Sequence, residues 1–210
     1  MNQKNGKNSI GLDRCFEDLD NPIDLFKKWF DKAKETEIND PNAVALGTAS
    51  ASKQPSVRMV LLKGLSDEGF VFYTIFNSKK GSDLKSNQLA SMCFHWKSIR
   101  RQVRIIGKVK EVSSKEADDY FNSRPYGSRI AAWASSQSEP MESRDVFLKK
   151  IIEFKKKFSD EKKVPRPKHW SGWRINPKEI EFWVDGDNRV HERLNYINDN
   201  GKWIKEILYP

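Results

Sequence analysis

Apolar residues recur at helical spacing in one early segment of the chain. Asn21 and Pro22 supply an N-cap residue and a proline suited to a first helical turn. The apolar residues that follow at this spacing are Ile23, Phe26, Trp29, Phe30 and Ala33. They predict an amphipathic helix from residue 22 to about residue 37. Residues 1–20 are polar and lack periodicity, so we expect a flexible N-terminal arm before the helix.

From residue 43 onward the pattern changes to short β-rich runs. Glycine, serine, asparagine and lysine separate the runs, and residues 79–87 have the pattern of a short helix between two of them. The predicted strands cover residues 43–51, 56–63, 69–76, 89–96 and 102–112. Successive strands at such short spacing favour an antiparallel barrel over a doubly wound sheet.

Helical patterns return in the second half of the chain. Ser113 and Glu116 form a capping box, which predicts a helix that ends before Pro125. Further helices are expected at residues 128–135 and 141–158, followed by a proline-rich linker at 164–167 and strands at 170–176 and 202–208, the last after an Asn200-Gly201 turn. The expected fold is mainly β with peripheral helices (α+β), in a single domain over residues 21–210.

A predicted hairpin near the C-terminus carries an unusual group of cations. Residues 180–183 read as one strand, residues 185–188 as a turn, and the run from Arg189 to Arg193 as a second strand that pairs back. Side chains alternate along a strand, so Arg189, His191 and Arg193 would share one face. Such a face suits an anionic ligand, and this interpretation stands slightly ahead of a solvated basic surface.

Composition and short motifs limit the classes of ligand and site that this protein can have. The 210-residue chain carries a formal net charge of +9, which favours anionic partners, although lysine runs such as 155–157 are typical of solvated surfaces. Neither common nucleotide-cradling glycine loop occurs, and the three histidines show no metal-ligand spacing. The two cysteines suggest no disulfide framework, and no apolar signal or membrane-spanning run is present, so we expect a cytoplasmic protein.

Two blocks of sequence resemble one known family. The block Glu181-Phe182-Trp183 followed by Arg189-x-His191-Glu192-Arg193 is similar to the C-terminal motif of the pyridoxamine 5'-phosphate oxidase family, and Arg58-Met59-Val60-Leu61-Leu62-Lys63 resembles a second block of it. The matches run in order from Arg58 to the C-terminus. The resemblance implies an FMN-binding split β-barrel and a homodimer with FMN between two subunits. It also implies oxidation of pyridoxamine or pyridoxine 5'-phosphate to pyridoxal 5'-phosphate by O2, with release of H2O2.

The resemblance also assigns roles to individual residues. It implies that FMN is bound by Arg58, Met59, Val60, Leu61, Leu62, Lys63, Tyr73, Thr74, Lys79, Lys80, Gln102, Gln137, Ser138, Trp183 and Arg193. The substrate phosphate falls to Lys63, Tyr120, Arg124 and Ser128, and the substrate ring to the catalytic positions Arg189 and His191. Lys79 departs from the family, which commonly has arginine there, so Lys80 is the stronger candidate for the FMN phosphate.

Each of these groups also has an ordinary structural interpretation. Arg58 and Lys63 can be cations that extend from strand ends, residues 78–80 a charged loop, and Tyr120, Arg124 and Ser128 a capped helix end with an exposed arginine. Two other classes of protein therefore stay open. One is a split-barrel protein that binds FMN or haem and acts on another substrate, and the other is a basic nucleic-acid-binding module.

Overall fold

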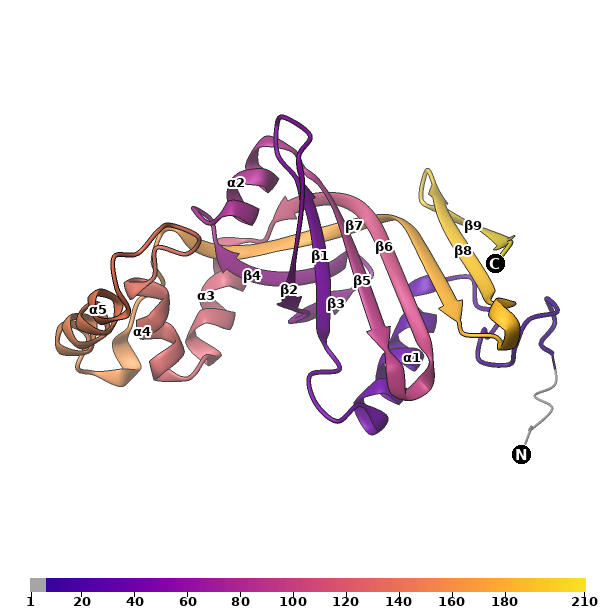
Figure 1. Cartoon of the computed structure of the whole chain (residues 1–210), viewed down its shortest axis with the longest axis horizontal. Coiled ribbons are helices and arrows are strands. Elements are labelled where there is room, and N and C mark those ends of the chain that lie inside the picture. Colours follow the sequence, from indigo (N-terminus) through magenta and orange to yellow (C-terminus); the bar gives the residue numbers. More distant parts are fainter. Residues whose placement is uncertain (1–6) are drawn as a thin grey trace.

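One curled antiparallel sheet forms the centre of the molecule (Figure 1). In the computed structural model, which describes residues 7–210, nine strands follow the order β2-β1-β5-β6-β7-β4-β3, with β8 beside β7 and β9 beside β8. The strands are β1 (Ala43–Ala49), β2 (Pro55–Leu61), β3 (Gly64–Ser66), β4 (Gly69–Ile75), β5 (Leu89–Trp96), β6 (Arg101–Glu111), β7 (Trp170–Val184), β8 (Glu192–Asp199) and β9 (Lys202–Leu208).

The 15-residue strand β7 joins the two ends of this sheet. It pairs with β6 on one edge, while on the other edge its first half pairs with β4 and its second half with β8. The register of β6 against β7 shifts between Ile106 and Gly107. A Cβ on Gly107 would lie 2.1 Å from the carbonyl oxygen of Asn176, so a glycine is required at this irregularity.

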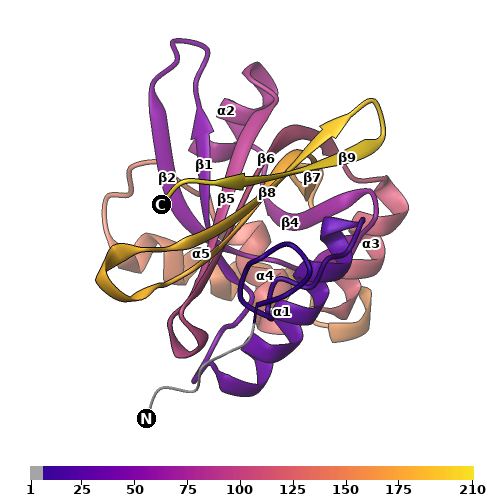
Figure 2. The same cartoon turned by 90° about the vertical axis from the view of Figure 1, so that its right-hand side faces the viewer.

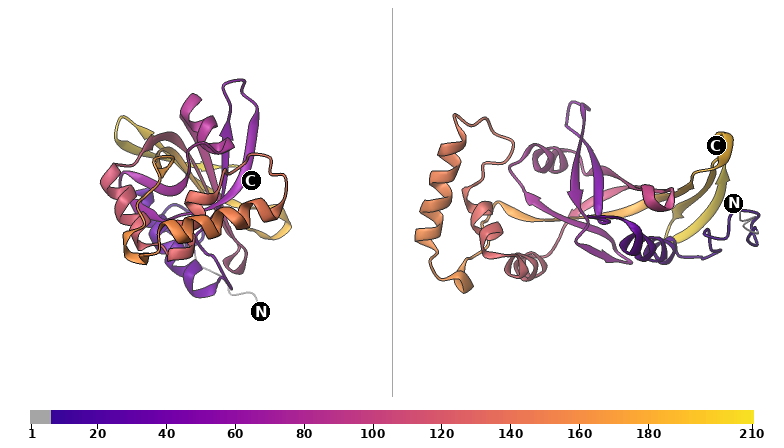
Figure 3. Two further views of the ribbon diagram at one scale, coloured as in Figure 1. Left: turned by 90° about the vertical axis from the view of Figure 1, so that its left-hand side faces the viewer. Right: turned by 60° about the horizontal axis from the view of Figure 1, so that its bottom comes forward.

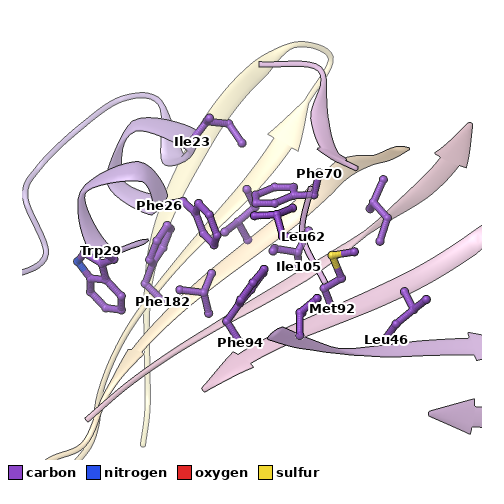
Figure 4. Close-up of a cluster of buried hydrophobic side chains, with 14 of the residues drawn as sticks. Ile23, Phe26, Trp29, Leu46, Leu62, Phe70, Met92, Phe94, Ile105 and Phe182 are labelled. Atoms are coloured by element: carbon purple, nitrogen blue, oxygen red, sulfur yellow. The ribbon is translucent and has the colours of Figure 1, made fainter. Parts of the chain in front are cut away.

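The first helix, α1 (Pro22–Thr36), matches its prediction and closes the main core. The Asn21 side chain accepts a hydrogen bond from the Ile23 amide, which caps the helix. Phe26 meets Phe70 and Phe94 with ring centroids 4.9 and 5.1 Å apart, and Trp29 meets Phe182 edge-on (Figure 4). Such aromatic pairs each contribute about 0.5–1.5 kcal/mol beyond the burial of apolar area, so α1 is held firmly on the sheet.

The remaining helices gather mostly at one end of the molecule (Figures 1 and 3). They are α2 (Lys79–Ser86), α3 (Ser114–Ser123), α4 (Tyr126–Ala134) and α5 (Arg144–Lys157), with short 3-10 turns η1 (Lys97–Ile99), η2 (Glu161–Lys163) and η3 (Asp187–Arg189). The Ser113 hydroxyl accepts from the Glu116 amide, as the capping box predicts. Within the described residues, no helix is both long and apolar enough to cross a membrane.

The segment before α1 differs from the flexible arm that the sequence suggests. Phe16 is fully buried, the Trp29 indole donates to the Cys15 carbonyl at 2.7 Å, and the Tyr196 hydroxyl donates to the Leu19 carbonyl at 2.8 Å. Residues 7–20 therefore pack beside α1 and the β8–β9 hairpin (Figure 2). Residues 1–6, which the same prediction covered, lie outside the described residues.

The prediction that the second strand of the C-terminal hairpin begins at Arg189 is wrong. Residues 187–189 form η3, and β8 begins only at Glu192. The cause is local backbone geometry: Asn188 and Arg189 both have positive φ angles, 54° and 63°, which no strand allows. Arg189 and His191 thus lie in a loop between β7 and β8, and they do not share a strand face with Arg193.

Candidate active site

A cavity of about 430 Å³ opens between the sheet and the helical end of the molecule. Strands β2 and β4 form one wall, and α3, α4 and the start of β7 form the other. Its walls include Met59, Val60, Leu61, Lys63, Tyr73, Thr74, Lys80, Tyr120, Arg124, Ser128, Gln137 and Trp170. Most of the residues predicted to bind the substrate phosphate or FMN therefore meet at one cavity, although they are far apart in the sequence.

The four residues predicted to bind the substrate phosphate converge in this cavity. Tyr120 projects from α3, Arg124 caps the C-terminus of α3, Ser128 lies on α4, and Lys63 follows β2. A phenol, a guanidinium, a hydroxyl and an ammonium provide donors from several directions, as a phosphate group requires. We call these four residues the phosphate grip.

A stack of aromatic rings supports the phosphate grip from behind. The Tyr73 ring stacks on Tyr120, with centroids 3.9 Å apart, and is nearly parallel to Trp170, with centroids 5.3 Å apart. The guanidinium of Arg124 lies over Trp170 at 4.9 Å. Burial raises the pKa of Tyr73 to about 12 and raises that of Tyr120 as well, so both phenols stay protonated and can donate.

The guanidinium of Arg124 has the environment expected of a side chain that binds an anion. Its Nη1 atom is buried and has no hydrogen-bond partner within the described part of the chain. Burial also lowers the pKa of this guanidinium, which means that its charge is poorly solvated. A buried donor that is left unpaired is costly, and an incoming phosphate oxygen would satisfy it.

Lys80 is a second buried cation in the lining of the cavity. Its side chain is almost fully buried, and its ammonium donates to Gln137 Oε1 at 2.8 Å, Thr74 Oγ1 at 3.2 Å and Ser78 Oγ at 3.4 Å. These partners in the described residues are neutral oxygens. Burial, and then the nearby charge of Arg58, lowers the pKa of Lys80. An uncompensated buried cation of this kind fits the phosphate of FMN.

Arg58 and Lys79 face Asp83, a residue that the sequence analysis did not single out. Arg58 donates to Thr48 Oγ1 and Ser56 Oγ, each at 2.7 Å, and its Nη2 lies 3.8 Å from Asp83 Oδ2. Lys79 lies 3.6 Å from the same buried carboxylate, with half of its side chain exposed. The spacing of four residues between Lys79 and Asp83 on a predicted helix was the available signal for this contact.

Several other predicted residues form a second cluster near the C-terminal end of β7. Gln102 pairs with Trp183 across β6 and β7, and the Trp183 and His191 rings lie 4.6 Å apart. His191 Nδ1 lies 3.2 Å from the Gly186 amide, which donates to it, and 3.2 Å from Asp185 Oδ1. The loop with Arg189 and His191 is thus held by contacts of the His191 ring with Asp185, Gly186 and Trp183 rather than by strand pairing.

Arg193 is oriented by a buried carboxylate. Its Nε donates to Glu181 Oε1 at 2.8 Å, and this hydrogen bond raises the pKa of the guanidinium. The second Glu181 oxygen accepts from Arg104 at 2.9 Å. Glu181 belongs to the C-terminal motif, but no sequence pattern indicated that it would accept a hydrogen bond from Arg193.

The cavity near α3 and α4 and the cluster at the end of β7 lie far apart in space within one molecule (Figures 1 and 3). Strand β7 connects them, with Trp170 at the phosphate grip and Trp183 beside His191. At about 3.3 Å per residue, this stretch of strand spans roughly 40 Å. Ser138 lines a neighbouring cavity of about 650 Å³ together with Gln137. A single chain therefore does not bring the whole predicted site together.

Taken together, the curled antiparallel sheet and the helices around it define a split-barrel protein, whose cavity is lined by the cationic side chains of Lys63, Lys80 and Arg124. A family model described as pyridoxamine 5'-phosphate oxidase matches residues 30–158, and one described as the pyridoxine 5'-phosphate oxidase C-terminal dimerisation region matches residues 170–210. The chain belongs to the pyridoxamine 5'-phosphate oxidase family.

Individual relatives agree with this assignment. A pyridoxine/pyridoxamine 5'-phosphate oxidase from Pelagibacter ubique is 58% identical over 207 residues, which cover 98% of this chain and 100% of the relative. One from Sinorhizobium fredii is 52% identical and covers 93% and 95%. The crystal structure of PhzG from Burkholderia lata, in complex with tetrahydrophenazine-1-carboxylic acid, has a TM-score of 0.88 at 28% identity and covers 98% of this chain and 100% of PhzG.

A more distant structure shares the fold. A pyridoxamine 5'-phosphate oxidase-related, FMN-binding protein from Nostoc punctiforme has a TM-score of 0.71 at 15% identity, with 90% of this chain and 98% of that chain covered. The split-barrel prediction and the family resemblance are thereby confirmed.

Proposed function

We propose that this protein is an FMN-dependent oxidase that converts pyridoxamine 5'-phosphate or pyridoxine 5'-phosphate to pyridoxal 5'-phosphate. O2 accepts the two electrons and becomes H2O2, and the amine substrate also takes up water and releases ammonia. The observation that carries this proposal is the phosphate grip, in which the buried Nη1 of Arg124 has no partner in the described chain. The relatives named as oxidases of these substrates support it.

The donor set of the cavity fits FMN. Lys80 offers a positive charge in the cavity where the cofactor phosphate would bind, and Gln137 offers an amide close to it. The charge of Arg58 lies near Lys80, and its guanidinium also faces Asp83. The printed description of the Nostoc punctiforme neighbour as FMN-binding is consistent with this assignment. Bound FMN would supply the redox chemistry, which no side chain provides.

The protein's own contribution is binding and orientation. The phosphate grip would hold one end of the substrate, while Arg189 and His191 would hold its ring from the opposite side. A cation at the ring can also balance negative charge that develops during oxidation. Arg193, aligned by Glu181, is placed in this proposal at the cofactor.

The separation of the two clusters supports a homodimer. The phosphate grip and His191 are separated along β7 by more than a small substrate can span, so a second copy would have to supply one of the two sets. Val57, Met59 and Leu89 expose large apolar side chains on β2 and β5, which is the kind of surface that a subunit interface covers. The match to a dimerisation region supports the same arrangement.

Substrate selectivity tests the proposed function. We expect the yellow, FMN-loaded protein to form peroxide with pyridoxamine 5'-phosphate and far less with unphosphorylated pyridoxamine. Arg124→Ala should raise the KM for the phosphorylated substrate and leave FMN bound. Equal turnover of both substrates would refute the assignment of the phosphate grip. A colourless protein that is retained on nucleic acid in a salt-dependent manner would refute the oxidase itself.

Light scattering of the FMN-loaded protein tests the arrangement of the subunits. We expect a dimer that carries one FMN per chain. A monomer with full FMN occupancy would contradict a site that is shared between two subunits.

A further inference from the structure

Arg166 lies behind the phosphate grip and contacts two separate elements of the fold. It belongs to the segment between η2 and β7, and its side chain is 15% exposed. Its Nε donates to Asp118 Oδ1 at 2.6 Å, and its Nη1 donates to the Trp170 carbonyl at 2.8 Å. One guanidinium therefore ties α3 to the first residue of β7.

The backbone around Arg166 is itself restrained. Prolines on both sides limit its conformations, and the residue before a proline favours extended geometry. The Pro165 carbonyl accepts from the Trp133 indole at 2.8 Å, and the Pro167 carbonyl accepts from the Trp170 amide at 3.0 Å. Because the segment is held on α4 and on β7, the position of the Arg166 guanidinium is well defined.

Both elements joined by Arg166 carry parts of the phosphate grip. Asp118 lies on α3 two residues before Tyr120, and Arg124 is the C-cap residue of this helix. Trp170 provides the ring that lies under the Arg124 guanidinium at 4.9 Å. The separation between α3 and Trp170 fixes where Arg124 can sit, and Arg166 bridges that separation directly.

We propose that Arg166 is a positioning residue that sets the recognition of the substrate phosphate. Its two hydrogen bonds hold α3 and Trp170 together, and Arg124 is thereby aimed into the cavity. This inference rests on the proposed function, because it assumes that Arg124 binds the substrate phosphate. Arg166 does not line the cavity, and its effect on the substrate is exerted through Arg124 and Tyr120.

The same helix offers a matched control. Lys115 and Asp119 form an ion pair on α3 with an N–O distance of 2.6 Å, the same as for Arg166 and Asp118. Both side chains of the control pair are largely exposed and belong to one helix. Such a pair contributes little and joins no separate elements. Removing its carboxylate changes the charge of α3 as much as removing that of Asp118.

The experiment compares Arg166→Met and Asp118→Asn with Asp119→Asn in the FMN-loaded protein. We expect the first two variants to raise the KM for pyridoxamine 5'-phosphate about tenfold, since small displacements of a positioned group can cost up to about a hundredfold. The affinity for the product pyridoxal 5'-phosphate should fall by a similar factor, with kcat and the affinity for FMN unchanged. Asp119→Asn should match the wild type, and Arg166→Lys should recover part of the loss.

Two results would overturn this inference. Wild-type KM and product affinity in both Arg166→Met and Asp118→Asn would show that the bridge does not position the grip. Parallel losses of FMN affinity, kcat and thermal stability would show a general structural role instead. Arg124→Ala separates this inference from the proposed function. If Arg124→Ala raises the KM for pyridoxamine 5'-phosphate and Arg166→Met does not, the inference about Arg166 alone is refuted. No effect of Arg124→Ala on KM refutes the proposed function and this inference with it.

Discussion

Gly172 leaves the space that the aromatic stack of the active site needs. A Cβ at this position would lie 2.8 Å from two carbons of the Tyr73 ring and 3.0 Å from Val112 Cγ2. The ring cannot move away freely, because Tyr120 stacks on it with centroids 3.9 Å apart. We therefore expect Gly172→Ala to displace Tyr73 and, with it, the Tyr120 phenol of the phosphate grip.

The size of the effect follows from the cost of overpacking. Extra methyl groups in a tightly packed region typically cost about 1–3 kcal/mol. If that strain is relieved by moving Tyr120, binding of the phosphorylated substrate should weaken by roughly 5- to 150-fold, since about 1.4 kcal/mol corresponds to a factor of ten. FMN affinity should fall as well, because Tyr73 is among the residues predicted to bind FMN, but by a smaller factor, because Lys80 and Arg58 lie outside the stack.

Steady-state peroxide assays and flavin fluorescence titrations measure the two effects separately. Gly127→Ala is the control, since a Cβ on Gly127, the residue before Ser128 on α4, would meet no atom within 4 Å. The reasoning is refuted if Gly172→Ala has the same KM for pyridoxamine 5'-phosphate as the wild type and as Gly127→Ala.

Three further predictions concern the cofactor and the substrate ring. Arg58→Ala should weaken FMN binding more than Lys79→Ala in fluorescence titrations, because Arg58 is better buried and a charge-assisted contact contributes about 1.5–3 kcal/mol; equal effects would contradict this. Arg189→Met and His191→Asn should slow flavin reduction in stopped-flow experiments, the arginine variant more severely, with the dimer and its colour intact. Wild-type rates in both would mean that the substrate ring binds elsewhere. The pKa of Lys80 is lowered from 10.5, so FMN affinity should fall as the pH rises through that lowered pKa, and Lys80→Arg should remove this dependence.

Much of the fold was predictable from local sequence patterns. Strand β5 (Leu89–Trp96), strand β9 (Lys202–Leu208) and the capped start of α1 match their predictions, because apolar runs, turn residues and caps act over a few neighbours. Strand β3 is three residues long and was missed, since so short a run carries no periodicity. The predicted break between strands at 176 and 180 is absent, and β7 continues through Pro177.

The site was predictable only in part, for physical reasons. A resemblance assigned the residues, and alternation along strands indicated shared faces, but neither shows that β7 runs unbroken from Trp170 past Trp183 and so holds the two clusters apart. The loop with Arg189 and His191 depends on positive φ angles and on the close approach of Gly186 to the Val190 carbonyl, which strand alternation cannot show. The contacts of Asp83 with Arg58 and of Arg166 with Asp118 join residues that are distant in the sequence.

Anaerobic mixing of the FMN-loaded protein with pyridoxamine 5'-phosphate tests the proposed oxidase reaction itself. We expect the visible absorbance of the flavin to decrease in a single turnover. Admission of O2 should then restore it, with equal amounts of pyridoxal 5'-phosphate and H2O2. Flavin absorbance that stays unchanged at saturating substrate, in protein with full FMN occupancy, would contradict the assignment of this chain as a pyridoxamine-phosphate oxidase.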